Sequence, residues 1–152
     1  MFILAFFVAL CLGVGALGGF WTSSSVTTWY VTLRKPSWNP PSWVFAPVWT
    51  FLYITMGIAA WIVWKHGSFV GLQAAVFLIQ LALNLGWSWL FFFKRSPYWA
   101  FIEVMALWVA IAVTNLYFWH VDPLAGLLIV PYLAWVTFAS TLNGVVWALN
   151  RS

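Results

Sequence analysis

Long apolar stretches separated by short polar segments dominate the chain. Each stretch holds at least 20 residues with almost no charge, and a helix needs about 20 such residues to cross a bilayer core about 30 Å thick. The stretches lack the period-two alternation of a barrel strand, so helices are expected. We therefore predict an all-α integral membrane protein. It is a single domain over residues 1–152, a five-transmembrane-helix bundle with spans at 1–21, 45–64, 69–93, 98–119 and 124–149.

The composition narrows the class of protein further. Of the 152 residues, 65% are hydrophobic, 22% aromatic and 5% charged, whereas a soluble domain carries roughly 25% charged residues. The net charge of +4 comes from six bases set against two acids, which is a shortage of acids and not a basic patch. A soluble domain, a disordered chain, a disulfide scaffold and a nucleic-acid binder are all excluded.

The cations are distributed unequally between the two ends of the predicted bundle. Five spans place the chain termini on opposite sides, and one side collects five of the six bases: Arg34, Lys35, Lys94, Arg95 and Arg151. The other side has only Lys65. Since cytoplasmic loops carry the excess of Lys and Arg, we expect the N-terminus outside and the C-terminus in the cytoplasm.

One connection, predicted at residues 22–44, is long. It begins with a serine and threonine run, continues through Trp29 and Tyr30, and ends in a proline-rich segment that contains Trp38 and Trp43. Prolines at 36, 40 and 41 oppose both helix and sheet. The aromatic residues favour a partly ordered lid folded over the bundle, or a segment lying among lipid headgroups; the two interpretations are compatible.

Tryptophan is abundant, with 14 residues, and about half of these lie near predicted helix ends, where an indole suits the membrane interface. Five lie deeper: Trp49, Trp87, Trp89, Trp108 and Trp135. An indole N–H in hydrocarbon needs a partner, so these five are expected to face the bundle interior or a cavity. They serve either as large packing residues or as walls for a flat apolar ligand.

Polar and small residues within the spans predict helix contacts. Gln73, Gln80 and Asn84 fall on one stripe and are expected to form hydrogen bonds between helices. Ala82 and Gly86 form a small-xxx-small pattern that lets helices approach closely, at a dimer interface or within the bundle. A similar pattern occupies residues 15–19, and Pro131 is expected to kink the last span.

The chain offers little conventional catalytic chemistry. Glu103 is the only acid in a predicted span, and we expect it to extend toward Lys94 and Arg95. No paired carboxylates, nucleophile with a base, or Cys/His cluster is present in the sequence, so no catalytic residues, no metal site and no required cofactor are predicted.

Several motifs together resemble the TspO/MBR family, which includes the translocator protein, the tryptophan-rich sensory protein and the peripheral-type benzodiazepine receptor. The first runs from Trp29-Tyr30 through Lys35-Pro36-Ser37-Trp38 and Pro40-Pro41 to Trp43-Val44, and it continues as Pro47-Val48-Trp49. Gln80 to Asn84 with Trp87, and Pro131 to Trp135 with Leu142-Asn143, match the third and fifth helices. The resemblance covers nearly the whole chain and identifies it with bacterial-type members.

The resemblance implies a membrane receptor or regulatory protein that binds porphyrins such as protoporphyrin IX and other flat apolar ligands, and that transports them. It also implies a homodimer. The residues that match the family's ligand pocket are Trp38, Trp43, Trp49, Asn84, Trp87, Trp99, Trp135, Ala139 and Leu142.

The sequence bears on three other possible functions. Trp49 and Trp135 match tryptophans that are implicated in light-dependent porphyrin degradation in some bacterial members of the family. Degradation of the bound porphyrin is therefore the alternative function that the resemblance implies. A transporter of hydrophobic cations would need an acid at mid-membrane, which the sequence lacks. Sterol binding is disfavoured because Gly144 stands where the mitochondrial sterol motif has tyrosine.

Overall fold

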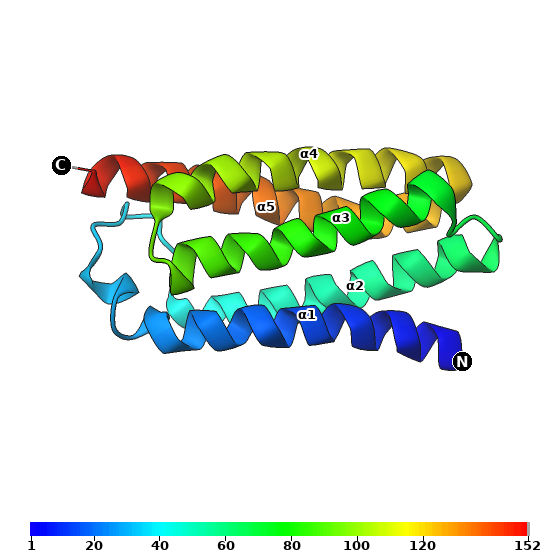
Figure 1. Cartoon of the computed structure of the whole chain (residues 1–152), viewed down its shortest axis with the longest axis horizontal. Helices are drawn as coiled ribbons and strands as arrows, with labels where there is room; N and C mark the ends of the chain where they lie inside the picture. Colours follow the sequence, from blue (N-terminus) through cyan, green and yellow to red (C-terminus); the bar gives the residue numbers. More distant parts are fainter. Residues whose placement is uncertain (152) are drawn as a thin grey trace.

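The computed structural model describes residues 1–151 as a bundle of five long helices, with no strand among them. The helices are α1 (Phe2–Val26), α2 (Phe45–Lys65), α3 (Gly71–Ser88), α4 (Pro97–Val121) and α5 (Pro123–Asn150). All five are long and apolar enough to cross a membrane, which confirms the predicted fold class. They run roughly antiparallel, and the two termini lie at opposite ends of the bundle (Figure 1).

The first helix is longer than the sequence predicted, and the long connection is correspondingly shorter. The prediction ended the span at residue 21, but α1 continues to Val26. The hydroxyl groups of Thr22, Ser23 and Ser24 donate to backbone carbonyls three or four residues earlier. The polar side chains are therefore satisfied within the helix, and the run that suggested a loop belongs to the last turns of α1.

The remaining boundaries agree with the prediction within a few residues, with one local difference. The predicted span 69–93 consists of α3 followed by a π-helical segment, Trp89–Phe93. Two short 3₁₀ helices, Tyr30–Thr32 and Ser42–Val44, lie within the long connection. Proline begins both α4 and α5, because the first position of a helix needs no backbone N–H donor.

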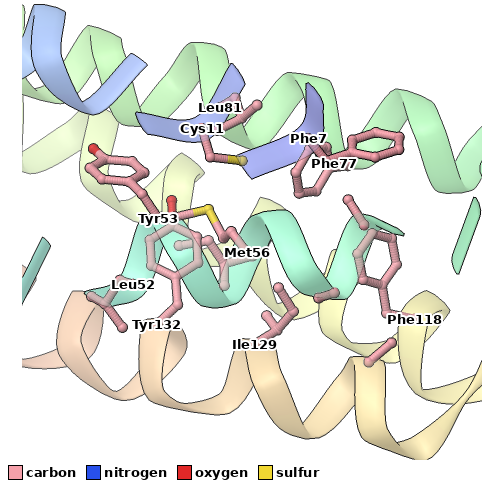
Figure 2. Close-up of a cluster of buried hydrophobic side chains, with 14 of the residues drawn as sticks. Phe7, Cys11, Leu52, Tyr53, Met56, Phe77, Leu81, Phe118, Ile129 and Tyr132 are labelled. Atoms are coloured by element: carbon pink, nitrogen blue, oxygen red, sulfur yellow. The ribbon is translucent and has the colours of Figure 1, made fainter. Parts of the chain in front are cut away.

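A dense core fills the bundle away from the long connection (Figure 2). Cys11, Met56, Phe77 and Phe118 are fully enclosed there by the five helices, and the rings of Phe77 and Phe118 stack with centroids 5.8 Å apart. The rings therefore interlock between the helices in this half of the bundle.

A buried hydrogen-bond network joins three helices at the edge of this core. Tyr53 on α2 donates its hydroxyl to Asn84 Oδ1 at 2.6 Å, and Asn84 Nδ2 donates to the hydroxyl of Tyr132 at 2.8 Å. Tyr132 in turn donates to Gln80 Oε1 at 2.7 Å. The prediction that Gln80 and Asn84 bond between helices is confirmed, whereas no such bond is found for Gln73 among the described residues.

Candidate functional site

A cavity of about 420 Å³ lies between the helices at the end of the bundle that carries the long connection. Its walls come from the C-terminal half of α1, the N-terminal half of α2, the end of α3 with its π-helical segment, and the C-terminal half of α5. A cavity of this size is typical of small-molecule sites. Its lining is mostly apolar and aromatic, so it suits an apolar ligand.

Three of the five deep tryptophans form one aromatic cluster in this cavity. The ring of Trp49 lies 6.3 Å from that of Trp87 and 6.4 Å from that of Trp135, measured between centroids. The planes of Trp49 and Trp135 are nearly perpendicular, at 88°. Trp49 also stacks on Tyr53 at 5.7 Å, so the aromatic cluster rests on the buried hydrogen-bond network.

The indole N–H groups of Trp87 and Trp135 differ in whether they have a hydrogen-bond partner. Trp87 Nε1 donates to Asn143 Oδ1 at 3.0 Å, and Asn143 Nδ2 donates to the carbonyl of Pro97 at 2.9 Å. Within residues 1–151, Trp135 Nε1 is buried and has no hydrogen-bond partner. A buried donor without an acceptor costs free energy. Trp135 therefore lines the cavity, while its own N–H donor stays buried and unsatisfied.

The other two deep tryptophans do not face the interior, which corrects that prediction. Trp89 and Trp108 are each 37% exposed. Trp89 stacks on Phe93 and lies under the ammonium group of Lys94, and Trp108 donates its indole N–H to Thr137 Oγ1 on α5 at 2.7 Å. Each indole meets its polar or aromatic partner on the outside of the bundle, so neither needs a cavity.

Of the nine predicted pocket residues, Trp49, Trp87, Trp135, Ala139 and Leu142 line the cavity. Four do not. Trp99 is 58% exposed on α4, a helix that contributes nothing to the cavity lining. Asn84 is taken up by the two tyrosine hydroxyls. Trp38 packs outside the lining against Phe138, and Trp43 is 74% exposed.

The small residues of α1 and α3 make contacts within the bundle. A Cβ placed on Gly15 would lie 2.5 Å from the ring of Tyr53. One placed on Gly86 would lie 3.3 Å from Glu103 Oε1. The absence of a side chain at Gly86 thus leaves room for Glu103 of α4. Ala82, the other residue of the small-xxx-small pattern on α3, is exposed.

The predicted extension of Glu103 toward Lys94 and Arg95 is wrong. Both carboxylate oxygens are buried without a hydrogen-bond partner in the described residues, and Lys94 instead lies over the ring of Trp89 at 5.0 Å. The gap that Gly86 leaves in α3 receives the side chain. No cluster of three His, Cys, Asp or Glu side chains is found in residues 1–151.

The long connection folds over the end of the cavity. Tyr30 lines the cavity and is only 3% exposed, and its hydroxyl donates to Asn39 Oδ1 at 2.9 Å. Burial raises the pKa of Tyr30 to about 12, against the smaller opposite effect of Asn39. Tyr30 therefore belongs to a part of the connection that covers the cavity as a lid. The exposed Trp43 instead fits the interpretation of a segment that lies among lipid headgroups.

Two further contacts anchor this connection. Asn150 at the end of α5 accepts from Arg34 N at 2.9 Å and donates to Arg34 O at 2.8 Å. Lys35 donates to the carbonyls of Tyr30 and Leu33 and lies 4.7 Å from the centroid of the Tyr30 ring. Burial lowers the pKa of Lys35. Sequence reasoning missed Asn150, because a polar residue beyond the last apolar turn gives no sign of its partner.

Gly144, where the sterol motif has tyrosine, is closely packed. A Cβ at this position would lie 2.8 Å from the ring of Phe101 on α4. A larger side chain there would displace Phe101, so the α4–α5 contact favours glycine.

Comparisons with known proteins agree with this architecture. Residues 7–148 match the TspO/MBR family. The chain is 47% identical over 151 residues to the tryptophan-rich protein TspO of Chlorobaculum tepidum, covering 97% of this chain and 95% of that protein. It is 42% identical over 150 residues to the translocator protein of Sus scrofa, and the match covers 91% of this chain and 86% of that protein. It is 43% identical over 123 residues to the tryptophan-rich sensory protein of Cereibacter sphaeroides, and the match covers 80% of this chain and 77% of that protein. These matches extend over the five helices, the long connection and the cavity, and the chain therefore belongs to the TspO/MBR family of integral, multi-pass membrane proteins.

Proposed function

We propose that the cavity binds porphyrins, such as protoporphyrin IX, or other flat apolar ligands. Membership of the TspO/MBR family supports a membrane receptor or regulatory role. The observation that carries the proposal is the cluster of Trp49, Trp87 and Trp135 in one cavity of about 420 Å³. Flat indole faces offer stacking surfaces to a planar ring.

The unsatisfied donor of Trp135 adds a polar preference. Its buried Nε1–H has no acceptor within residues 1–151, and a rotation of the indole ring toward the cavity would let a ligand carbonyl or carboxylate oxygen accept from it. The ligand class is therefore a flat apolar molecule with an acceptor at its edge, which includes porphyrins.

Light-dependent degradation of the bound porphyrin is a second candidate. Trp49 and Trp135 line the same cavity with their rings 6.4 Å apart, so both could contact one bound ring. This candidate adds to porphyrin binding and requires it.

Titration of the purified protein with protoporphyrin IX tests both candidates. Tryptophan quenching is followed in the dark and product formation in light, for the wild type, Trp49→Phe and Trp135→Phe. Trp99→Phe is the matched control, since Trp99 lies outside the cavity. We expect saturable quenching, weakened by about tenfold in the two cavity variants and unchanged in the control.

The outcomes separate the candidates. Absence of saturable quenching in the wild type would reject both. Binding without a photoproduct would leave a binding protein only. A photoproduct that disappears in Trp49→Phe or Trp135→Phe would support degradation.

Sidedness and assembly are further proposals. The termini lie at opposite ends of the bundle (Figure 1), and the bias of Lys and Arg favours a cytoplasmic C-terminus. We also propose a homodimer, as the family resemblance implies. Protease protection of tags at each terminus tests the first proposal, and light scattering in detergent tests the second.

A further inference from the structure

The exposed part of the cavity lining is confined to two helices. Six lining residues are exposed, and all belong to α1 or to the start of α2 with the turn before it: Ala16, Gly19, Ser23, Ser42, Ala46 and Thr50. The lining residues of α3, its π-helical segment and α5 are buried or half-buried. The cavity is therefore open along the line between α1 and α2.

These two helices approach each other backbone to backbone on the far side of the cavity. A Cβ on Gly57 of α2 would lie 2.6 Å from the Cα of Val8 on α1. Nearer the long connection, the ring of Tyr53 fills the space beside Gly15. Beyond that point the side chains along the opening are small, and a Cβ on Gly19 would meet nothing within 4 Å. We call the six exposed residues the α1/α2 opening.

The end of the bundle, by contrast, is covered. Arg34 and Asn150 form two backbone-to-amide hydrogen bonds that fix the long connection to α5. Tyr30 beneath it is buried. A ligand that enters from the aqueous end would have to pass the long connection, which these contacts hold to α5.

The depth of the α1/α2 opening places it in the bilayer. Ala16 lies ten residues before the end of α1 at Val26, which is about 15 Å along a helix. Thr50 lies eight residues after Ser42, or about 12 Å. The opening thus extends across about half of a hydrocarbon core about 30 Å thick. Ser23 and Ser42 lie at the headgroup end, and the hydroxyl of Thr50 at the deep end is satisfied within its own helix by the carbonyl of Ala46.

We propose that the ligand enters the cavity sideways from the membrane, through the α1/α2 opening. The proposal rests on the proposed ligand-binding function of the cavity and restricts its ligand class. The ligand is an amphiphile already dissolved in the bilayer, with its flat apolar body among the acyl chains and its polar groups at the headgroup level. The small side chains of the opening let a flat molecule pass without movement of the long connection.

Entry kinetics distinguish the two routes. Protoporphyrin IX is dissolved in phosphatidylcholine vesicles, mixed with protein in vesicles of the same lipid, and followed by tryptophan quenching. Gly19→Leu narrows the opening and is expected to slow association by about tenfold or more. Gly13→Leu is the matched control, because Gly13 lies on the same helix, is exposed with nothing within 4 Å of its added Cβ, and does not line the cavity.

A third variant tests the covered end. Asn150→Ala removes both hydrogen bonds to Arg34, and entry through the membrane predicts an association rate within about twofold of the wild type. A wild-type rate in Gly19→Leu, or a marked acceleration in Asn150→Ala, would overturn the proposal.

A readout without ligand separates this proposal from the proposed function. A fluorophore on Gly19→Cys, in a Cys11→Ala background, is exposed to lipids with nitroxides on their acyl chains or to aqueous iodide. The α1/α2 opening predicts quenching by the lipids, with Gly13→Cys as the reference for a lipid-facing position. Stronger quenching by iodide would show that the opening faces water and would refute lateral entry, even if the wild type binds no porphyrin.

Discussion

The two ends of the bundle use their aromatic residues differently. Away from the long connection, rings such as Phe77 and Phe118 stack against each other and fill the space between helices (Figure 2). At the other end, Trp49, Trp87 and Trp135 stand around a cavity. The difference arises from α1, which contacts α2 backbone to backbone at Val8 and Gly57 but presents small side chains along the cavity. A membrane bundle can thus carry a rigid core and an open site on the same five helices.

The largest expected effect comes from adding one methyl group at the tight end. Gly57→Ala places a Cβ 2.6 Å from the backbone of Val8, so α1 and α2 must separate, at a cost of about 3 kcal/mol. Gly19→Ala, made where space is open, should gain about 0.5 to 1 kcal/mol of helix propensity. Reversible unfolding in mixed micelles measures both; equal effects of the two substitutions would contradict the contrast between the ends.

The hydrogen-bond network between the two ends is the next test. Tyr132→Phe removes a group that both accepts from Asn84 and donates to Gln80, leaving two buried amides with one partner fewer. We expect a loss of about 1 to 2 kcal/mol of unfolding free energy. Tyr53→Phe removes a single donor to Asn84 and should cost about half as much. If both variants unfold like the wild type, the network adds nothing to stability.

A smaller effect is expected at the end of α1 beside the cavity. Ser25 is buried and donates to the carbonyl of Phe92 in the π-helical segment at 2.6 Å. Ser25→Ala leaves that carbonyl without this donor and should cost about 1 kcal/mol. Ser24→Ala is the control, since Ser24 is exposed and bonds only within its own helix. Hydrogen exchange at residues 89–93 should increase in the first variant alone.

The smallest effect concerns the polar turns at the far end. Asp122 Oδ2 lies 3.0 Å from His66 Nε2. The hydrogen bond from Leu124 N–H, followed by His66, holds the pKa of Asp122 below its ordinary value of 3.8. The resulting stabilisation is complete above pH 3.8 and is lost as the pH falls through the lowered pKa. The unfolding free energy measured across this pH range should therefore show a pH-dependent loss that is absent in Asp122→Asn. Identical pH profiles of the two proteins would show that Asp122 does not contribute to this pH dependence.

The sequence alone determined the five spans, their short turns and the family, because length, hydropathy and local motifs are properties of the chain. It also identified Trp49, Trp87 and Trp135 as interior residues. It could not separate them from Trp89 and Trp108, which lie at comparable depth. Membrane helices are apolar on every side, so their pattern does not mark the buried face.

Only the tertiary structure decided which side of each helix meets a neighbour. Asn84 became part of a hydrogen-bond network and not a pocket wall because Tyr53 and Tyr132 arrive from two other helices. Glu103 lies against Gly86 and not beside the nearby cations because α3 leaves a gap there. The cavity and its opening between α1 and α2 likewise depend on where two helices touch and where they do not. That spacing is set by side chains far apart in the sequence.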